Sequence, residues 1–235
     1  MADIVLVHGA FHGGWCWRDV ASALGAAGHR VARPTLTGLA DRRHLLSAAT
    51  DLDTHVDDIV NTVVYEEMHD VVLVCHSYGG GPCVPAADRI ADRVAALVLL
   101  DALLPIDGLS CLELRERAHS PWPIEVTGSL TVPPPPSDVF GLRGADLARV
   151  EALVTPHPVA TFTQPVALTG AYDRIGVRHY HRARGYDAPY FDDSAARAEA
   201  AGWQVAHHDL VHDMMLTDPE WTVGAILDAV RAAGG

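Results

Sequence analysis

Lysine is absent from the 235-residue sequence, and all seventeen basic residues are arginine. This absence excludes every mechanism that depends on a lysine amine, such as a Schiff base, a P-loop lysine or a serine–lysine nucleophile pair. Positive charge is scarce overall, because thirty acidic residues leave a formal net charge of −13. Nucleic-acid binding relies on clustered lysine and arginine, so no nucleic-acid partner is expected.

Cysteine and long apolar runs are also scarce. The four cysteines, Cys16, Cys75, Cys83 and Cys111, show no CxxC or CxC spacing, which is typical of reduced thiols in a cytoplasm. The first residues lead directly into the run IVLVHG without the basic start of a secretory signal. No apolar run approaches the roughly 18 residues of a membrane span. We therefore expect a cytoplasmic protein with no membrane partner.

Short apolar runs alternate with helical patterns along the chain. This alternation is typical of an α/β fold in which helices cover both faces of a parallel sheet. The length favours one domain over residues 1–235. Strands are predicted at residues 4–8, 29–34, 71–75, 94–100, 177–182 and 203–208. Helices are predicted at residues 17–29, 54–66, 79–91, 194–201 and 219–232.

Residues 106–170 interrupt this alternation. Prolines are frequent there, including the run Pro133–Pro136, and proline excludes long regular elements. A non-periodic insert of this length is usually a functional lid or a disordered segment. Because the insert also carries apolar side chains such as Trp122, Phe140 and Phe162, we expect it to fold as a cap over a site.

The stretch VVLVCHSYGG, residues 71–80, ends a predicted strand at a single serine. A sharp strand-to-helix turn exposes the side chain at its apex, provided that small residues flank it. Cys75 and Gly79 are the small residues around Ser77. The pattern predicts Ser77 as a nucleophile and Cys75 as a residue that points away from the substrate. The structural alternative is a turn without a catalytic role.

Three further segments favour catalysis. VHGAFHGG, residues 7–14, follows the first strand, and the backbone amides of Ala10 and Tyr78 are predicted to stabilise an oxyanion. His212 follows the last predicted strand, which is the place of a general base. Asp101 ends the strand next to that of the serine, where it could orient an imidazole. A plain glycine-rich turn and a loop-tethering aspartate are the structural alternatives.

Position in the chain, rather than residue type, favours His212 over His207 and His208, because the sequence has fourteen histidines. A zinc site in HHDLVH, residues 207–212, is the competing interpretation. It lacks the glutamate of HExxH and an obvious third ligand, so no metal site is expected.

Together these segments resemble the α/β-hydrolase fold, and within it a small group of plant methylesterases and hydroxynitrile lyases with bacterial esterase relatives. The resemblance rests on VLVHGAFHGGWCW (5–17), VVLVCHSYGG (71–80), LVLLDALLP (97–105) and HDMMLTDPE (212–220). It implies a mostly parallel six-stranded sheet with helices on both faces and an inserted cap. It also implies Ser77 as nucleophile, His212 as general base, and Ala10 and Tyr78 as oxyanion donors.

Two departures from this group bear on the site. Cys75 replaces the first glycine of G-x-S-x-G, and is small enough to be tolerated there. The plant enzymes carry the acid in a C-T-x-D motif after the penultimate strand, where this sequence reads HRARGYDAPYF with a shifted Asp187. Other α/β hydrolases carry an acid at the place of Asp101. Asp101 is therefore the first candidate and Asp187 the second.

The predicted function is hydrolysis of a small, apolar carboxylic ester through an acyl-enzyme, which requires no cofactor. Phe11, Trp122 and Phe162 are candidate pocket residues, with ordinary core packing as the alternative for each. The protein is expected as a monomer or homodimer with a small-molecule substrate.

Other functions on the same fold remain open. Plant hydroxynitrile lyases need a lysine just after the catalytic histidine, and Asp213 occupies that place, which disfavours their chemistry. A non-hydrolytic cyclase or lyase acting on a biosynthetic intermediate is the first alternative. A binding protein with a silent triad is the second.

Overall fold

Six strands form one wholly parallel sheet in the order β2-β1-β3-β4-β7-β8. The structure is a computed structural model that describes residues 1–234. The strands are β1 (Asp3–Val7), β2 (Arg30–Ala32), β3 (Val71–His76), β4 (Val94–Leu100), β7 (Val177–Ala183) and β8 (Gln204–His208). The central strand β3 is buried along its whole length, as its unbroken apolar run predicts for a sheet covered on both faces.

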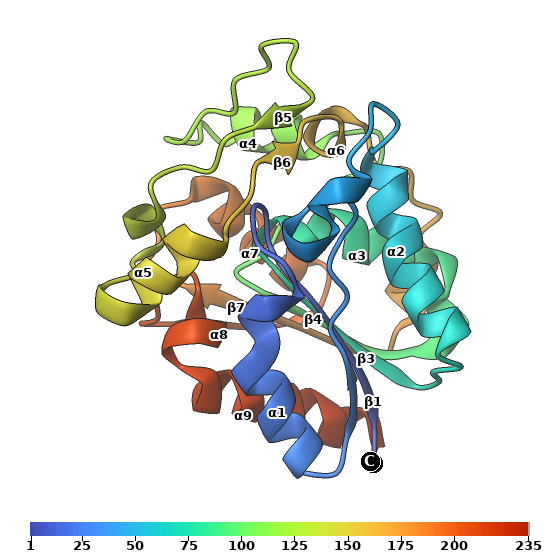
Figure 1. The fold of residues 1–235 in the computed structure, drawn as a ribbon. Coiled ribbons are helices and arrows are strands. Elements are labelled where there is room, and N and C mark those ends of the chain that lie inside the picture. The colour runs from blue at the N-terminus through green and yellow to red at the C-terminus, as the bar shows by residue number, and fades with distance from the viewer. Residues whose placement is uncertain (235) are drawn as a thin grey trace.

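Helices cover both faces of the sheet (Figure 1). α1 packs beside α9, and α2 packs beside α3. The α-helices outside the insert are α1 (Arg18–Ala26), α2 (Leu52–Tyr65), α3 (Gly80–Arg89), α7 (Pro189–Ala200), α8 (Met214–Thr217) and α9 (Pro219–Gly234). Short 3₁₀ helices occupy Gly14–Trp17, Ala40–Leu45, Ser77–Gly79, Ala91–Arg93, Ser137–Phe140 and Ala171–Arg174. Within residues 1–234, no helix is both long and apolar enough to cross a membrane.

Local sequence explains where α2 begins and which face it buries. The side chain of Asp51 accepts a hydrogen bond from the Thr54 amide at 2.9 Å, and the Thr54 hydroxyl accepts one from the Asp51 amide at 3.3 Å. This reciprocal cap satisfies amides that lack a partner inside the helix. Val56, Ile59 and Val63, spaced three and four residues apart, are buried.

The predicted six-stranded α/β architecture with helices on both faces is confirmed, with two differences of detail. The sheet is wholly rather than mostly parallel. α7 begins at Pro189 instead of Ser194, because proline is favoured at the first position of a helix. The early start also buries Tyr190 and Phe191.

The segment 106–170 lies over one end of the sheet (Figure 1). It contains α4 (Cys111–Arg117), β5 (Thr131–Val132), α5 (Gly144–Leu153), β6 (His157–Pro158) and α6 (Ala160–Thr163). β5 and β6 pair in antiparallel fashion. The sequence did not predict these elements, because they are short and bury few side chains; in α5 only Val150 is buried.

α3 approaches the loop after β4 very closely. A Cβ atom at Gly80 would lie 1.9 Å from the carbonyl oxygen of Leu103. Only a residue without a side chain fits at this position, so Gly80 fixes how α3 sits against the sheet.

Gly80→Ala should therefore destabilise the protein by roughly 1–3 kcal/mol, because backbone must move to make room. Gly25→Ala in α1 is the matched control. No atom lies within 4 Å of a Cβ at Gly25, so alanine should stabilise that helix by about 0.5–1 kcal/mol. Urea unfolding followed by circular dichroism measures both changes. Equal stability of Gly80→Ala and the parent protein would contradict the close approach.

Candidate active site

Ser77 lies at the sharp turn between β3 and α3. Its backbone φ of 56° is in the left-handed region, which residues other than glycine adopt rarely and often at functional sites. The turn is tight, since a Cβ atom at Gly79 would lie 2.8 Å from the carbonyl oxygen of His8. Cys75 is fully buried, with its Sγ 3.7 Å from the carbonyl oxygen of Val98 in β4. Its thiol therefore packs against the neighbouring strand.

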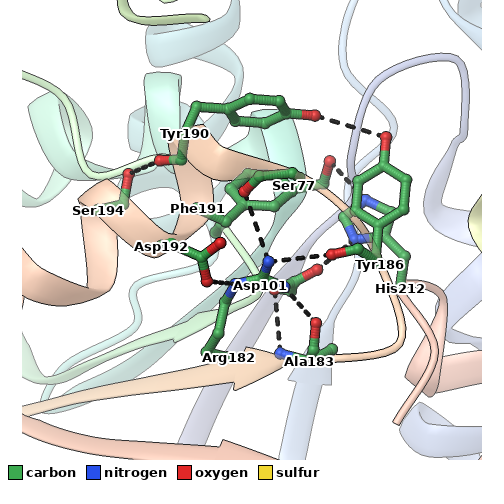
Figure 2. A network of polar contacts seen from close by, with 12 residues as sticks. Ser77, Asp101, Arg182, Ala183, Tyr186, Tyr190, Phe191, Asp192, Ser194 and His212 are labelled. Carbon is green, nitrogen blue, oxygen red and sulfur yellow. Dashed lines mark hydrogen bonds and ion pairs between the residues drawn. The ribbon is translucent and has the colours of Figure 1, made fainter. Parts of the chain in front are cut away.

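Side chains from three separate elements meet at this turn (Figure 2). The Nε2 atom of His212 lies 2.9 Å from Ser77 Oγ, and its Nδ1 atom lies 2.6 Å from Asp101 Oδ2. Ser77 follows β3, Asp101 follows β4, and His212 lies in the loop between β8 and α8. The three residues converge because parallel strands present their carboxyl ends at one edge of the sheet.

A buried arginine binds the second carboxylate oxygen of Asp101 (Figure 2). Arg182 Nη1 donates to Asp101 Oδ1 at 2.8 Å, and the Ala183 amide donates to the same oxygen at 3.0 Å. Arg182 Nε also donates to Asp192 at 2.7 Å. The buried carboxylate is thus paired and hydrogen-bonded on one side, which fixes its other oxygen toward His212.

The structure does not bring Asp187 to this site. Its side chain is exposed and makes no hydrogen bond or ion pair within residues 1–234. Arg182 lies near the end of β7, the strand after which the plant enzymes carry their acid. In this chain β7 provides the arginine, and the carboxylate that it binds is Asp101, which follows β4.

The loop after β1 lies against the serine. A Cβ atom at Gly9 would lie 2.8 Å from Ser77 Cβ. Within residues 1–234 the Ala10 amide makes no hydrogen bond. The Tyr78 amide lies in the first turn of a helix, where amides have no partner inside the helix. Both predicted donors are therefore available beside Ser77.

Buried imidazoles hold this loop. His12 Nδ1 lies 2.8 Å from the carbonyl oxygen of Ala10. The Phe11 amide donates to His157 Nδ1 at 3.2 Å. Phe11 itself has a φ of 66°, a strained conformation that the surrounding contacts must maintain. The loop geometry thus depends on residues from the insert as well as from β1.

A buried ion pair lies beside His212. His12 Nε2 is 3.2 Å from Asp213 Oδ2, and the two side chains are 2% and 0% exposed. Burial raises the pKa of the Asp213 carboxyl, but the charges and contacts of His12, His76 and His212 together outweigh burial, and the pKa falls to about 2. Burial likewise lowers the pKa of His12, but the charge and contact of Asp213 and the carbonyl of Ala10 together outweigh it, and the pKa is raised above its ordinary value. The pair thus favours the charged form of each partner, and His12 links Ala10 to the residue after His212.

A cavity of about 420 Å³ opens at Ser77. The predicted pocket residues Phe11, Trp122 and Phe162 all line it, as do the predicted oxyanion donors Ala10 and Tyr78. Insert residues therefore form part of its wall, which is mostly apolar, as is usual for small-molecule sites.

Sequence reasoning missed several residues of this site. Tyr186 and Phe191 stack on His212 with ring centroids 4.3 Å and 5.3 Å away (Figure 2). Phe140, which the sequence predicts only as an apolar residue of the cap, lies 5.7 Å from the same ring. Arg115 and Tyr190 also line the cavity. The aromatic pair at residues 190–191 lies at the start of α7, before the helix that the sequence predicts. No local periodicity marked these positions.

The structure does not assemble the zinc ligands considered for residues 207–212. Within residues 1–234, the one group of three close metal-ligating side chains is His76, His212 and Asp213. His207 and His208 are not part of it. Both ring nitrogens of His212 already face Ser77 and Asp101.

Comparison with known protein families supports a hydrolase fold. The family model described as "Alpha/beta hydrolase family" matches residues 4–225. Among solved structures, the H243A variant of tomato methylketone synthase I in complex with β-ketoheptanoate superposes with a TM-score of 0.83. That match covers 99% of this chain and 98% of the other at 19% sequence identity, so it concerns the fold alone.

Curated relatives carry esterase names. A carbendazim hydrolyzing esterase from a Nocardioides species is 38% identical over 234 residues, covering 93% of this chain and 96% of that protein. Methylesterase 2 from Arabidopsis thaliana is 35% identical over 105 residues, covering 43% of this chain and 39% of that protein. The predicted resemblance to methylesterases and bacterial esterases is thereby confirmed.

Proposed function

Because the chain belongs to the alpha/beta hydrolase family and is a carboxylic ester hydrolase, we propose that it cleaves a small, largely apolar ester through an acyl-enzyme on Ser77. One observation carries this proposal: Ser77, His212 and Asp101 form a continuous set of contacts at 2.9 Å and 2.6 Å beside an apolar cavity. This is the geometry of a nucleophile, a general base and the acid that orients it.

The roles follow from the atoms that face each other. Ser77 O–H donates to His212 Nε2, which accepts the proton as Ser77 Oγ attacks the ester carbonyl carbon. His212 Nδ1–H donates to Asp101, which holds the tautomer that leaves Nε2 free to accept. The same imidazole then returns the proton to the departing alcohol, and water cleaves the acyl-enzyme by the reverse sequence.

The oxyanion of each tetrahedral intermediate accepts hydrogen bonds from the amides of Ala10 and Tyr78. Loss of one such donor typically lowers kcat by about 10²–10³-fold. Segment 106–170 acts as a cap that shields the cavity from water, since Trp122 and Phe162 both line it. The esterase named for carbendazim hydrolysis supports a substrate with an apolar, aromatic portion, which the aromatic walls would accommodate.

A fluorophosphonate probe tests the nucleophile directly. We expect one stoichiometric adduct on Ser77, located by intact-protein and peptide mass spectrometry. His212→Ala should slow labelling by at least about 10³-fold, because the serine then lacks its base. Ser77→Ala should abolish it.

Turnover of simple methyl esters distinguishes the hydrolase from other chemistry on this fold. Labelling of Ser77 without turnover of any ester would favour a non-hydrolytic cyclase or lyase. A folded parent protein that gains no adduct would exclude Ser77 as a working nucleophile.

A further inference from the structure

Arg115 is the one arginine that lines the cavity within the part of the chain that the structure describes. It belongs to α4 of the insert. No carboxylate lies within ion-pair distance of it among residues 1–234. Glu125 also lines the cavity, but it forms no ion pair with Arg115 among residues 1–234.

Contacts on two sides hold the guanidinium in place. Its central carbon lies 4.3 Å from the ring centroid of Tyr190, a cation–π contact. Its Nη2 donates to the carbonyl oxygen of Trp122 at 2.7 Å and to Ser120 Oγ at 3.3 Å. The side chain is therefore oriented before any ligand binds, which favours recognition.

Two nitrogens of the oriented guanidinium, Nε and Nη1, have no hydrogen-bond partner within residues 1–234. Arg115 Nε is buried, whereas Nη1 is accessible. A buried donor without a partner is costly. In a mostly apolar cavity, a small number of such polar groups fixes the orientation of the ligand. A ligand that supplies an acceptor can pair with the accessible Nη1.

Arg115 also lies near the reacting groups. Tyr190, over which it stacks, has its hydroxyl 3.4 Å from that of Tyr186, and Tyr186 stacks on His212 at 4.3 Å (Figure 2). Burial raises the pKa of Tyr186, and the charge of Arg115 acts against this rise. The arginine therefore lies along the same wall of the cavity as the base.

From this arrangement we propose that Arg115 is a specificity-determining residue that binds an uncharged hydrogen-bond acceptor of the substrate, a carbonyl oxygen or a ring nitrogen separate from the scissile ester. Nη2 is already occupied and Nε is buried, so Nη1 is the accessible nitrogen that remains for an acceptor. The acidic surface disfavours an anion. The substrate class is thus an apolar ester with a second acceptor group. This inference rests on the proposed ester hydrolysis.

Matched ester pairs test the proposal. Methyl 3-oxobutanoate, methyl 4-oxopentanoate and methyl 5-oxohexanoate are each compared with the methyl ester of the same chain without the ketone. The measured quantity is the ratio of kcat/KM for the two members of each pair, followed by proton release. We expect the parent protein to prefer at least one keto ester by about tenfold or more, as for hydrogen bonds to a charged group.

Arg115→Met removes the donors but keeps an apolar side chain of similar length, and should reduce that ratio to near one. Arg117→Met is the control, because Arg117 is on the same helix, exposed and outside the cavity; it should retain the ratio. An unchanged ratio in Arg115→Met, or no preference at any keto position in the parent protein, would overturn the proposal.

Failure of the proposed function gives a different result, namely no turnover of any ester by the parent protein. In that case, calorimetry measures the equilibrium binding of the same ester pairs and tests the role of Arg115 separately from hydrolysis. Tighter binding of a keto ester that Arg115→Met abolishes would support the acceptor site. Equal binding of both members by both proteins would contradict it.

Discussion

Asp101→Asn should lower kcat for a simple methyl ester by about 10⁴-fold, the loss typical of this change in a serine–histidine–aspartate triad. Asparagine keeps the shape of the side chain, but its amide can donate to His212 Nδ1. The imidazole then carries its proton on Nε2, facing Ser77 Oγ at 2.9 Å, and cannot accept the serine proton. Steady-state kinetics measures the effect.

Asp187→Asn is the comparison that separates the two candidate acids. Asp187 is exposed and makes no contact with His212, so its variant should retain the activity of the parent protein. Asp192→Asn is a second control, because it removes another partner of Arg182 without touching the imidazole. A large loss in Asp187→Asn, with Asp101→Asn active, would contradict the proposed roles.

Asp213→Ala should destabilise the protein by about 3–5 kcal/mol, the usual cost of breaking a buried ion pair by removing one partner. The variant removes the anion that faces His12, which is 2% exposed, so the buried imidazole must either release its proton or stay charged without a partner. Asp209→Asn in the same loop is the control, because Asp209 is exposed and should change stability by no more than about 0.5 kcal/mol. Urea unfolding near pH 6 measures both.

The same pair predicts how stability depends on pH. The pKa of Asp213 falls from 3.8 to about 2 on folding, so its contribution is present above pH 3.8 and is lost as the pH falls toward 2. The pKa of His12 is raised above 6.5, so its contribution is full below pH 6.5 and is lost as the pH rises through the raised value.

Asp213→Asn should reduce both dependences, because residue 213 no longer titrates and His12 loses the charged partner that raises its pKa. Unfolding free energies at pH 3, 6 and 9 provide the measurement. Parallel pH curves for the variant and the parent protein would show that the His12–Asp213 pair is not the cause.

Several features could be predicted from the sequence because their signals are local. An unbroken apolar run followed by a small-residue turn indicates a buried strand that delivers Ser77. The histidine after the last strand was selected by chain order, and the alternation of strands and helices gave the parallel sheet. The strand and turn signals lie beside the residue that they predict, whereas chain order and the alternation of elements are properties of the whole sequence.

The finer geometry of the site depends on contacts between residues that are far apart in the chain. Asp101 meets Arg182 across 81 positions, and His12 meets Asp213 across the first and last parts of the fold. Hydrophobic periodicity carries no information about such pairs. The sequence therefore left Asp101 and Asp187 as alternatives and did not indicate the ion pair between His12 and Asp213.

The sequence by itself thus determined the fold, the serine at its turn and the histidine that faces it, because strand and helix patterns encode local conformation. Only the tertiary structure decided which aspartate reaches His212 and that Arg115 enters the cavity with a free donor. The physical reason is that burial, pairing and orientation of polar groups depend on which distant segments the folded chain brings into contact.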